Sequence, residues 1–112
     1  MKMYRDYLKE RLGDELVERP EGFATYRYVN DFGTLAVYIV DLYVRPDFRK
    51  TKVASDMADE IVSVAKKEGH KVLLGTVAST AKNATDSIKV LLSYGMHFFR
   101  CNQDGLVFRK EI

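Results

Sequence analysis

Apolar residues recur with a helical period at the start of the chain. Tyr4, Leu8 and Leu12 are four residues apart, which predicts a helix over residues 2–12. Leu16 would continue the same spacing, but Gly13 weakens or ends the helix before it. The chain is therefore expected to open with an amphipathic helix.

The next segments change to patterns that are typical of strands. Residues 23–29 follow a proline–glycine break and alternate around aromatic side chains, which predicts a strand. Turn-forming residues occupy positions 30–33. Residues 35–44 are apolar on both faces except for Asp41, and such a run predicts a central strand of a sheet.

The second half of the chain alternates between helical and extended patterns. The predicted elements are a helix over 53–68, a strand over 71–77, a helix over 84–94 and a terminal hairpin of residues 96–102 and 106–112. With 112 residues and no internal boundary, the sequence predicts a single α/β domain over residues 1–112. Its order is helix, two or three antiparallel strands, helix, strand, helix and hairpin.

Composition and charge exclude several classes of protein. The chain has 18 basic and 16 acidic residues, a net charge of +2, and its charges are scattered, which argues against nucleic-acid binding. Cys101 is the single cysteine, so a reducing compartment is expected. We expect a soluble, cytoplasmic protein without a signal peptide, membrane segment or metal site. A homodimer or larger assembly is left open.

Basic residues gather between the central strand and the helix that begins near residue 53. Residues 49–55 form a turn that leads directly into that helix. Free N–H groups at a helix start, together with the helix dipole, favour an anion such as a pyrophosphate. The alternative is an ordinary basic turn that binds no ligand.

This stretch resembles the acetyl-CoA motif of the GCN5-related N-acetyltransferase (GNAT) family. In that motif, a strand ending Asp-Leu-Tyr-Val is followed by x-Pro-x-x-Arg and by x-x-Gly-x-Gly/Ala at a helix start. Arg49, Ala54 and Ser55 match the pattern, whereas Lys52 replaces its first glycine. Lys52 either obstructs the approach of the phosphates or contributes a charge of its own.

The resemblance implies a mixed, mostly antiparallel central sheet flanked by helices, with a truncated N-terminal part. It also implies acetyl-CoA as co-substrate. The pantetheine arm would bind the backbone of Leu42, Tyr43 and Val44, and the pyrophosphate would bind Arg49, Lys50, Thr51, Lys52, Val53, Ala54 and Ser55.

A later family motif, an Asn followed by a helix that carries a Tyr and ends in Gly-Phe, resembles residues 83–95. Asn83 is one residue out of register, so it either contributes to the cofactor site or caps the helix. Leu91 stands where many members carry the tyrosine that protonates the leaving thiolate. Tyr94 is either a substitute for this acid or a packed aromatic residue at the helix end.

Acyl transfer requires a neutral amine, which implies a general base. Asp41 is the leading candidate, because it is the one charge in a long apolar strand, and partial burial strengthens a carboxylate as a base. The alternative is that Asp41 pairs with an arginine or caps a turn. Family members often carry an acidic pair here, and its first position is Val40 in this chain.

Two functions are consistent with these residues. The first is an acetyl-CoA-dependent N-acetyltransferase in which a small amine, a peptide or a protein amine attacks the thioester directly. The second is a non-catalytic binding or structural module of the same fold, such as a virus-encoded or accessory protein. Lys52, Leu91 and Val40 favour this second function because each departs from the family pattern.

Overall fold

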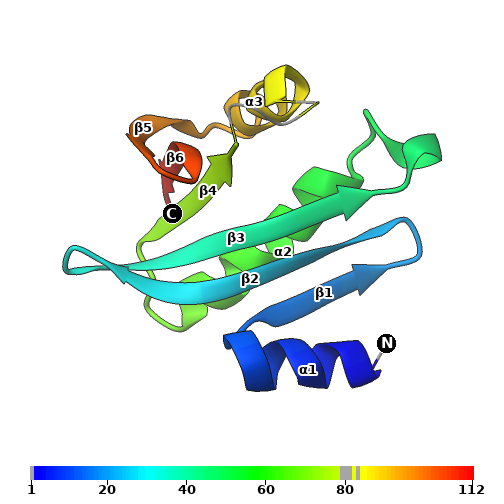
Figure 1. Ribbon diagram of the computed structural model, residues 1–112, viewed down its shortest axis with the longest axis horizontal. Coiled ribbons are helices and arrows are strands. Elements are labelled where there is room, and N and C mark those ends of the chain that lie inside the picture. The colour runs from blue at the N-terminus through cyan, green and yellow to red at the C-terminus, as the bar shows by residue number, and fades with distance from the viewer. Residues whose placement is uncertain (1, 79–81, 83) are drawn as a thin grey trace.

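Helices pack on both faces of a six-stranded sheet in the computed structural model, which describes residues 2–78, 82 and 84–112 (Figure 1). The elements are α1 (Lys2–Leu12), β1 (Glu15–Arg19), β2 (Gly22–Asp31), β3 (Thr34–Val44), the short 3-10 helix η1 (Pro46–Phe48), α2 (Val53–Lys67), β4 (Val72–Val77), α3 (Ala84–Ser93), β5 (His97–Asn102) and β6 (Gly105–Glu111). The strand order is β1-β2-β3-β4-β6-β5, and β3 and β4 form the one parallel pair among these strands. The expected mixed, mostly antiparallel sheet is confirmed.

Strand β1 is the element that the sequence pattern did not predict. Leu16 lies in this strand and pairs with Thr25 of β2, so it does not extend the apolar stripe of the first helix. The helix ends before it, because Gly13 adopts a φ of 70°, which glycine reaches without steric cost. Leu16 and Val17 are both buried, and successive strand residues face opposite sides of the sheet.

The main core lies between the sheet and helices α2 and α3. Met57, Ile61 and Ala65 of α2 are completely buried against inward-facing strand residues such as Val37 and Leu73. Partly buried side chains of α3 pack against the same cluster. No described helix combines the length and the apolar character needed to cross a bilayer.

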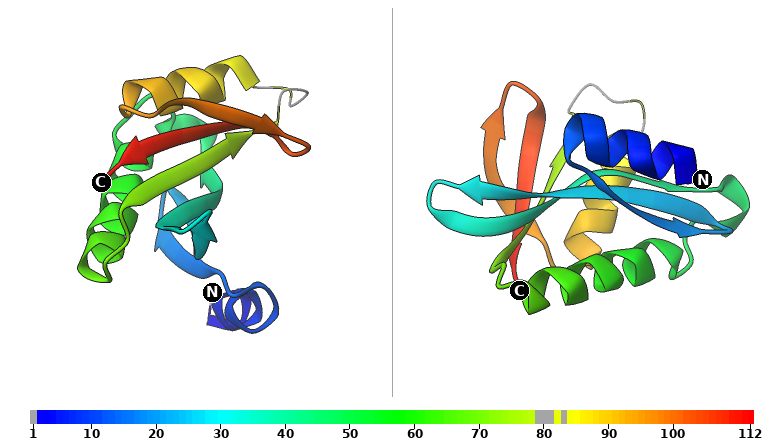
Figure 2. Two further views of the ribbon diagram at one scale, coloured as in Figure 1. Left: turned by 90° about the vertical axis from the view of Figure 1, so that its left-hand side faces the viewer. Right: turned by 90° about the horizontal axis from the view of Figure 1, so that it is seen from below.

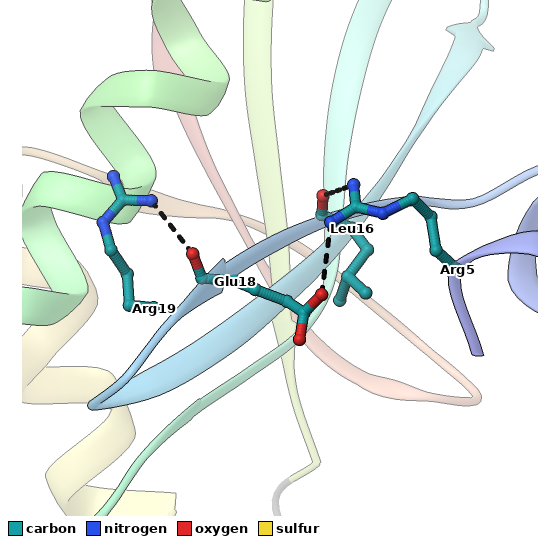
Figure 3. A network of polar contacts seen from close by, with 4 residues as sticks. All are labelled: Arg5, Leu16, Glu18 and Arg19. Carbon is teal, nitrogen blue, oxygen red and sulfur yellow. Dashed lines mark hydrogen bonds and ion pairs between the residues drawn. The ribbon is translucent and has the colours of Figure 1, made fainter. Parts of the chain in front are cut away.

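Helix α1 lies on the opposite face of the sheet from α2, over β1 and β2 (Figure 2). Arg5 fastens it to β1 by donating hydrogen bonds to the Leu16 carbonyl at 2.8 Å and to the Glu18 carboxylate at 3.2 Å (Figure 3). Beyond α1, this face of the sheet carries only a small buried cluster of Ala36, Val72, Leu74 and Val107. We call this side of the sheet the open face.

An ion pair joins the segment after α1 to β2. Arg27 donates from Nε to Asp14 Oδ1 at 2.7 Å and from Nη2 to Oδ2 at 3.1 Å. The Asp14 side chain is 1% exposed, whereas that of Arg27 is 38% exposed. Asp14 therefore depends on Arg27 for the charge and hydrogen bonds that water would otherwise supply.

Candidate active site

Strands β3 and β4 separate at the centre of the sheet. They pair from Ala36 with Val72 to Ile39 with Gly75, but β3 continues to Val44 and β4 to Val77 (Figure 1). Residues 41–44 keep β2 as their neighbour on one side and have no described strand on the other. Apart from the Val44 carbonyl, which accepts a hydrogen bond from Arg49, backbone groups on that side are available to a ligand. The stretch includes Leu42, Tyr43 and Val44, the residues expected to bind pantetheine.

A β-bulge marks the point of separation. Tyr26 pairs with Ile39 while Thr25 pairs with Asp41, so Val40 is an extra residue in β3. Such a residue is left out of the ladder, and bulges occur frequently beside active sites. The bulge places unpaired backbone at the mouth of the gap, where an N–H group can polarise a carbonyl oxygen.

Helix α2 begins beside the end of β3. Its N-cap residue is Lys52, whose side chain makes no capping hydrogen bond. Thr51 supplies the local contact instead, since its hydroxyl donates to the Phe48 carbonyl and accepts a long 3.4 Å hydrogen bond from the Val53 N–H. The residues of this turn are exposed, so an anion can reach the start of α2, where the first N–H groups of a helix have no partner within the helix.

The turn before α2 carries three of the predicted basic residues. Arg49 donates from Nε to the Val44 carbonyl at 3.0 Å, which holds its guanidinium at the end of β3. Lys50 has a φ of 61°, so its backbone lies in the left-handed region. Lys52 has a φ of −87°, which any residue adopts. Glycine at position 52 is therefore not required by the backbone conformation.

The candidate base does not lie where the sequence pattern suggested. Asp41 is exposed, so the expectation of a partly buried carboxylate is wrong. The reason is that β4 accompanies β3 only as far as Ile39, which leaves the following residues uncovered on that side. Among the described residues, Asp41 makes no ion pair, so the alternative of a paired carboxylate gains no support either.

Leu91 of α3 faces the point where the two strands separate. A methyl group placed on Gly75 would lie 3.9 Å from the Leu91 Cδ2 atom and 3.7 Å from the Met96 methyl carbon. Both side chains are apolar, so neither of them can donate a proton at this point.

Tyr94 lies at the end of α3 and joins that helix to α2. Its hydroxyl donates to the Asp59 carboxylate at 2.6 Å, and its ring packs against the main core. Burial, and then the hydrogen bond to Asp59, raise the pKa of Tyr94 above its ordinary value. A higher pKa makes a weaker acid, so this geometry supports the packed aromatic residue more than the proton donor.

We expect Tyr94→Phe to lower the free energy of unfolding by about 1 kcal/mol, because one hydrogen bond between helices is lost. Since the pKa is raised in the folded state, the contribution of the hydroxyl is complete below about pH 10 and decreases above it. Urea unfolding at pH 7 and pH 10.5 measures both effects. A large loss of turnover with unchanged stability would instead identify Tyr94 as the acid.

Asn83 lies outside the described residues. Two open surface hollows, which we call cavities, were not predicted from the sequence, and residues of β3 near the candidate site line both of them. One of about 430 Å³ is lined by residues of β2 to β6 that include Arg27, Tyr38, Val40, Leu74 and Thr76. Another of about 210 Å³ lies beside Phe23, Tyr43 and Arg45. Both are built from residues distant in sequence, so no local signal could have revealed them.

The chain was compared with known proteins. A family model described as the acetyltransferase (GNAT) family matches residues 5–95. None of the curated proteins matches the sequence.

Solved structures support the same fold. The anti-CRISPR protein AcrVA5 is 20% identical with a TM-score of 0.70, covering 88% of this chain and 99% of that one. The PaiA N-acetyltransferase from Thermoplasma acidophilum, solved with coenzyme A, is 15% identical with a TM-score of 0.69, covering 82% of this chain and 54% of that one. Naa50 from Arabidopsis thaliana, solved with the bisubstrate analogue CoA-Ac-MVNAL, is 19% identical with a TM-score of 0.65, covering 82% and 66%.

Proposed function

The chain belongs to the acetyltransferase (GNAT) family, and on that premise we propose that it transfers an acetyl group from acetyl-CoA to an amine. The observation that carries this proposal is the separation of β3 from β4 after Ile39 and Gly75, with the start of α2 close by in the chain. An unpaired strand edge suits the amides of a pantetheine arm. The N–H groups at the start of α2 suit a pyrophosphate.

The residues of the site fit acetyl-CoA as a co-substrate. Leu42, Tyr43 and Val44 would offer backbone groups to the pantetheine arm. Arg49, Lys50 and Lys52 would place positive charge around the phosphates, and Thr51, Val53, Ala54 and Ser55 would supply the turn and the N–H groups. Solved structures of similar fold contain coenzyme A or a coenzyme A conjugate, which supports this assignment.

Transfer would proceed by direct attack of the amine nitrogen on the thioester carbon. The C–N bond forms and the C–S bond breaks, while the ammonium proton leaves and the thiolate gains a proton. Unpaired backbone at the Val40 bulge would stabilise the oxyanion. With Leu91 beside the gap, the thiolate would take its proton from water, and exposed Asp41 is the candidate to accept the proton of the amine.

Two measurements test the proposal. Titration calorimetry of the full chain with acetyl-CoA should give a dissociation constant in the micromolar range. Release of free coenzyme A with a panel of amines should then show turnover that depends on the acceptor. Absence of binding would overturn the assignment of the site.

The second candidate function is a non-catalytic module that binds acetyl-CoA or a protein. The observation that favours it is the apolar environment of Gly75, where Leu91 and Met96 replace any acid. Binding of acetyl-CoA without turnover of any amine would support the module over the enzyme.

Substitutions of Lys52 separate the two effects that its side chain could have. The side chain is exposed and makes no ion pair within the described part of the chain, so it can turn toward bound phosphates. We expect Lys52→Ala to weaken acetyl-CoA binding about fivefold through the lost charge, and Lys52→Gly to match it. If Lys52→Gly binds tighter than Lys52→Ala, the β-carbon obstructs the loop.

A further inference from the structure

The two cavities lie on the same face of the sheet. Phe23 lines the smaller cavity, and Arg27 and Val29 line the larger one. These β2 residues are separated by even numbers of positions, and the extra residue of the bulge belongs to β3. Alternate residues of a strand point to the same side, so both cavities open on the open face.

An exposed strip of β3 connects the two cavities. Tyr38 and Val40 line the larger cavity and Tyr43 lines the smaller one, with exposed Asp41 between them. Val40 is 37% exposed and Tyr43 is 43% exposed, although both are large apolar side chains. Five residue steps at about 3.3 Å each give a strip roughly 17 Å long. Its middle is the Val40 bulge, where the proposed reaction would take place.

Most charges along this strip are already neutralised. In the larger cavity, Arg27 pairs with Asp14 and Arg100 pairs with Asp31. In the smaller cavity, Glu18 pairs with Arg5, and Arg19 pairs with Glu60.

One anion and one cation remain among the described lining residues. Asp104 in the larger cavity and Arg45 in the smaller cavity make no ion pair with any described residue. The first lies in the turn between β5 and β6, and the second follows the end of β3. The strip thus has opposite charges available at its two ends, and Asp41 between them is a further carboxylate without an ion pair to any described residue.

On the basis of the proposed function, we infer that the acceptor is an extended polypeptide segment whose lysine side chain is acetylated. The segment lies along β3 with an acidic residue at Arg45 and a basic residue at Asp104. A small amine would fill only the centre and leave both cavities empty. A small polyamine could reach Asp41 and Asp104 but would leave Arg45 without a partner.

The inference is tested with synthetic peptides of about nine residues that carry a central lysine. One peptide has glutamates before the lysine and arginines after it, a second has the reverse order, and a third is uncharged. N-acetyl-lysine methylamide is the small acceptor. For one charged order, kcat/KM should exceed that of the small acceptor at least tenfold, mainly through a lower KM.

Charge reversal at the end of the strip gives a sharper test. Arg45→Glu should raise the KM of the favoured peptide about fivefold, and lysines in place of its glutamates should restore it. The kcat/KM of the small acceptor should change less than twofold. Asp104→Lys should likewise raise the KM of the favoured peptide, and glutamates in place of its arginines should restore it. Leu92→Ala, at an exposed position of α3, should leave kcat/KM unchanged for both acceptors.

Equal or better turnover of the small acceptor would overturn the polypeptide acceptor while leaving the acetyltransferase intact. The same conclusion would follow if Arg45→Glu affected the peptide and the small acceptor alike. Acetyl-CoA binding without turnover of any acceptor would overturn the proposed function and this inference together, so the two failures are distinguishable.

Discussion

Replacing Arg27 by methionine is expected to lower the free energy of unfolding by about 3 kcal/mol, because a buried carboxylate loses its partner. The Asp14 side chain is 1% exposed and receives two hydrogen bonds from Arg27. Methionine keeps most of the volume and removes the charge. Urea unfolding at pH 7 measures the loss. It is followed by circular dichroism, because the chain has no tryptophan.

The two partners should not be equivalent. Asp14→Asn leaves an arginine that is 38% exposed and can be hydrated, so a smaller loss of about 1–2 kcal/mol is expected. Lys9→Met is the matched control, because it breaks the exposed pair of Lys9 with Glu15 in the same region and should destabilise the fold much less than Arg27→Met. A stability of Arg27→Met within 1 kcal/mol of the wild type would contradict this account.

Replacing Gly22 by alanine should cost about 3 kcal/mol and also impair acetyl-CoA binding. A β-carbon on Gly22 would lie 2.1 Å from the Tyr43 carbonyl oxygen and 3.0 Å from the Val44 Cα atom. Both contacts are to backbone, so the end of β3 must shift. This is the segment expected to bind pantetheine, and calorimetry together with thermal unfolding measures both losses.

Gly75→Ala is the control for this substitution. Both glycines lie in strands without a positive φ, but a β-carbon on Gly75 would meet only side-chain atoms at 3.7 Å and 3.9 Å. Those are ordinary van der Waals distances, so the fold should tolerate the methyl group. Equal destabilisation by the two substitutions would show that the loss of glycine, rather than the clash with β3, is responsible.

The elements of this fold are largely predictable because most follow a regular hydrophobic period. Strand β1 was missed because Leu16 and Val17 are adjacent apolar residues buried on opposite faces, so no alternation is visible. Leu16 also continues the four-residue spacing of Leu8 and Leu12. Gly13 ends the helix before Leu16, and the packing of α1 on one face and α2 on the other accounts for the burial of both residues in a strand.

The candidate site was predictable where it depends on local sequence. Residues 49–52 do lie in the turn before α2, and Val53, Ala54 and Ser55 are the first residues of that helix. The exposure of Asp41 was not predictable, since it depends on where β4 leaves β3. The partners of Tyr94 and Asp14 were equally hidden, because Asp59 and Arg27 come from other elements.

The short β3–β4 ladder has a consequence for dynamics. Only four residue pairs join the β1-β2-β3 half of the sheet to the β4-β6-β5 half, with α2 as the covalent crossover. Amide protons at this seam should exchange faster than those of the long β2–β3 hairpin. A pantetheine arm lying in the gap would bridge the two halves. Ligand binding would therefore both slow amide proton exchange at the seam and raise the melting temperature.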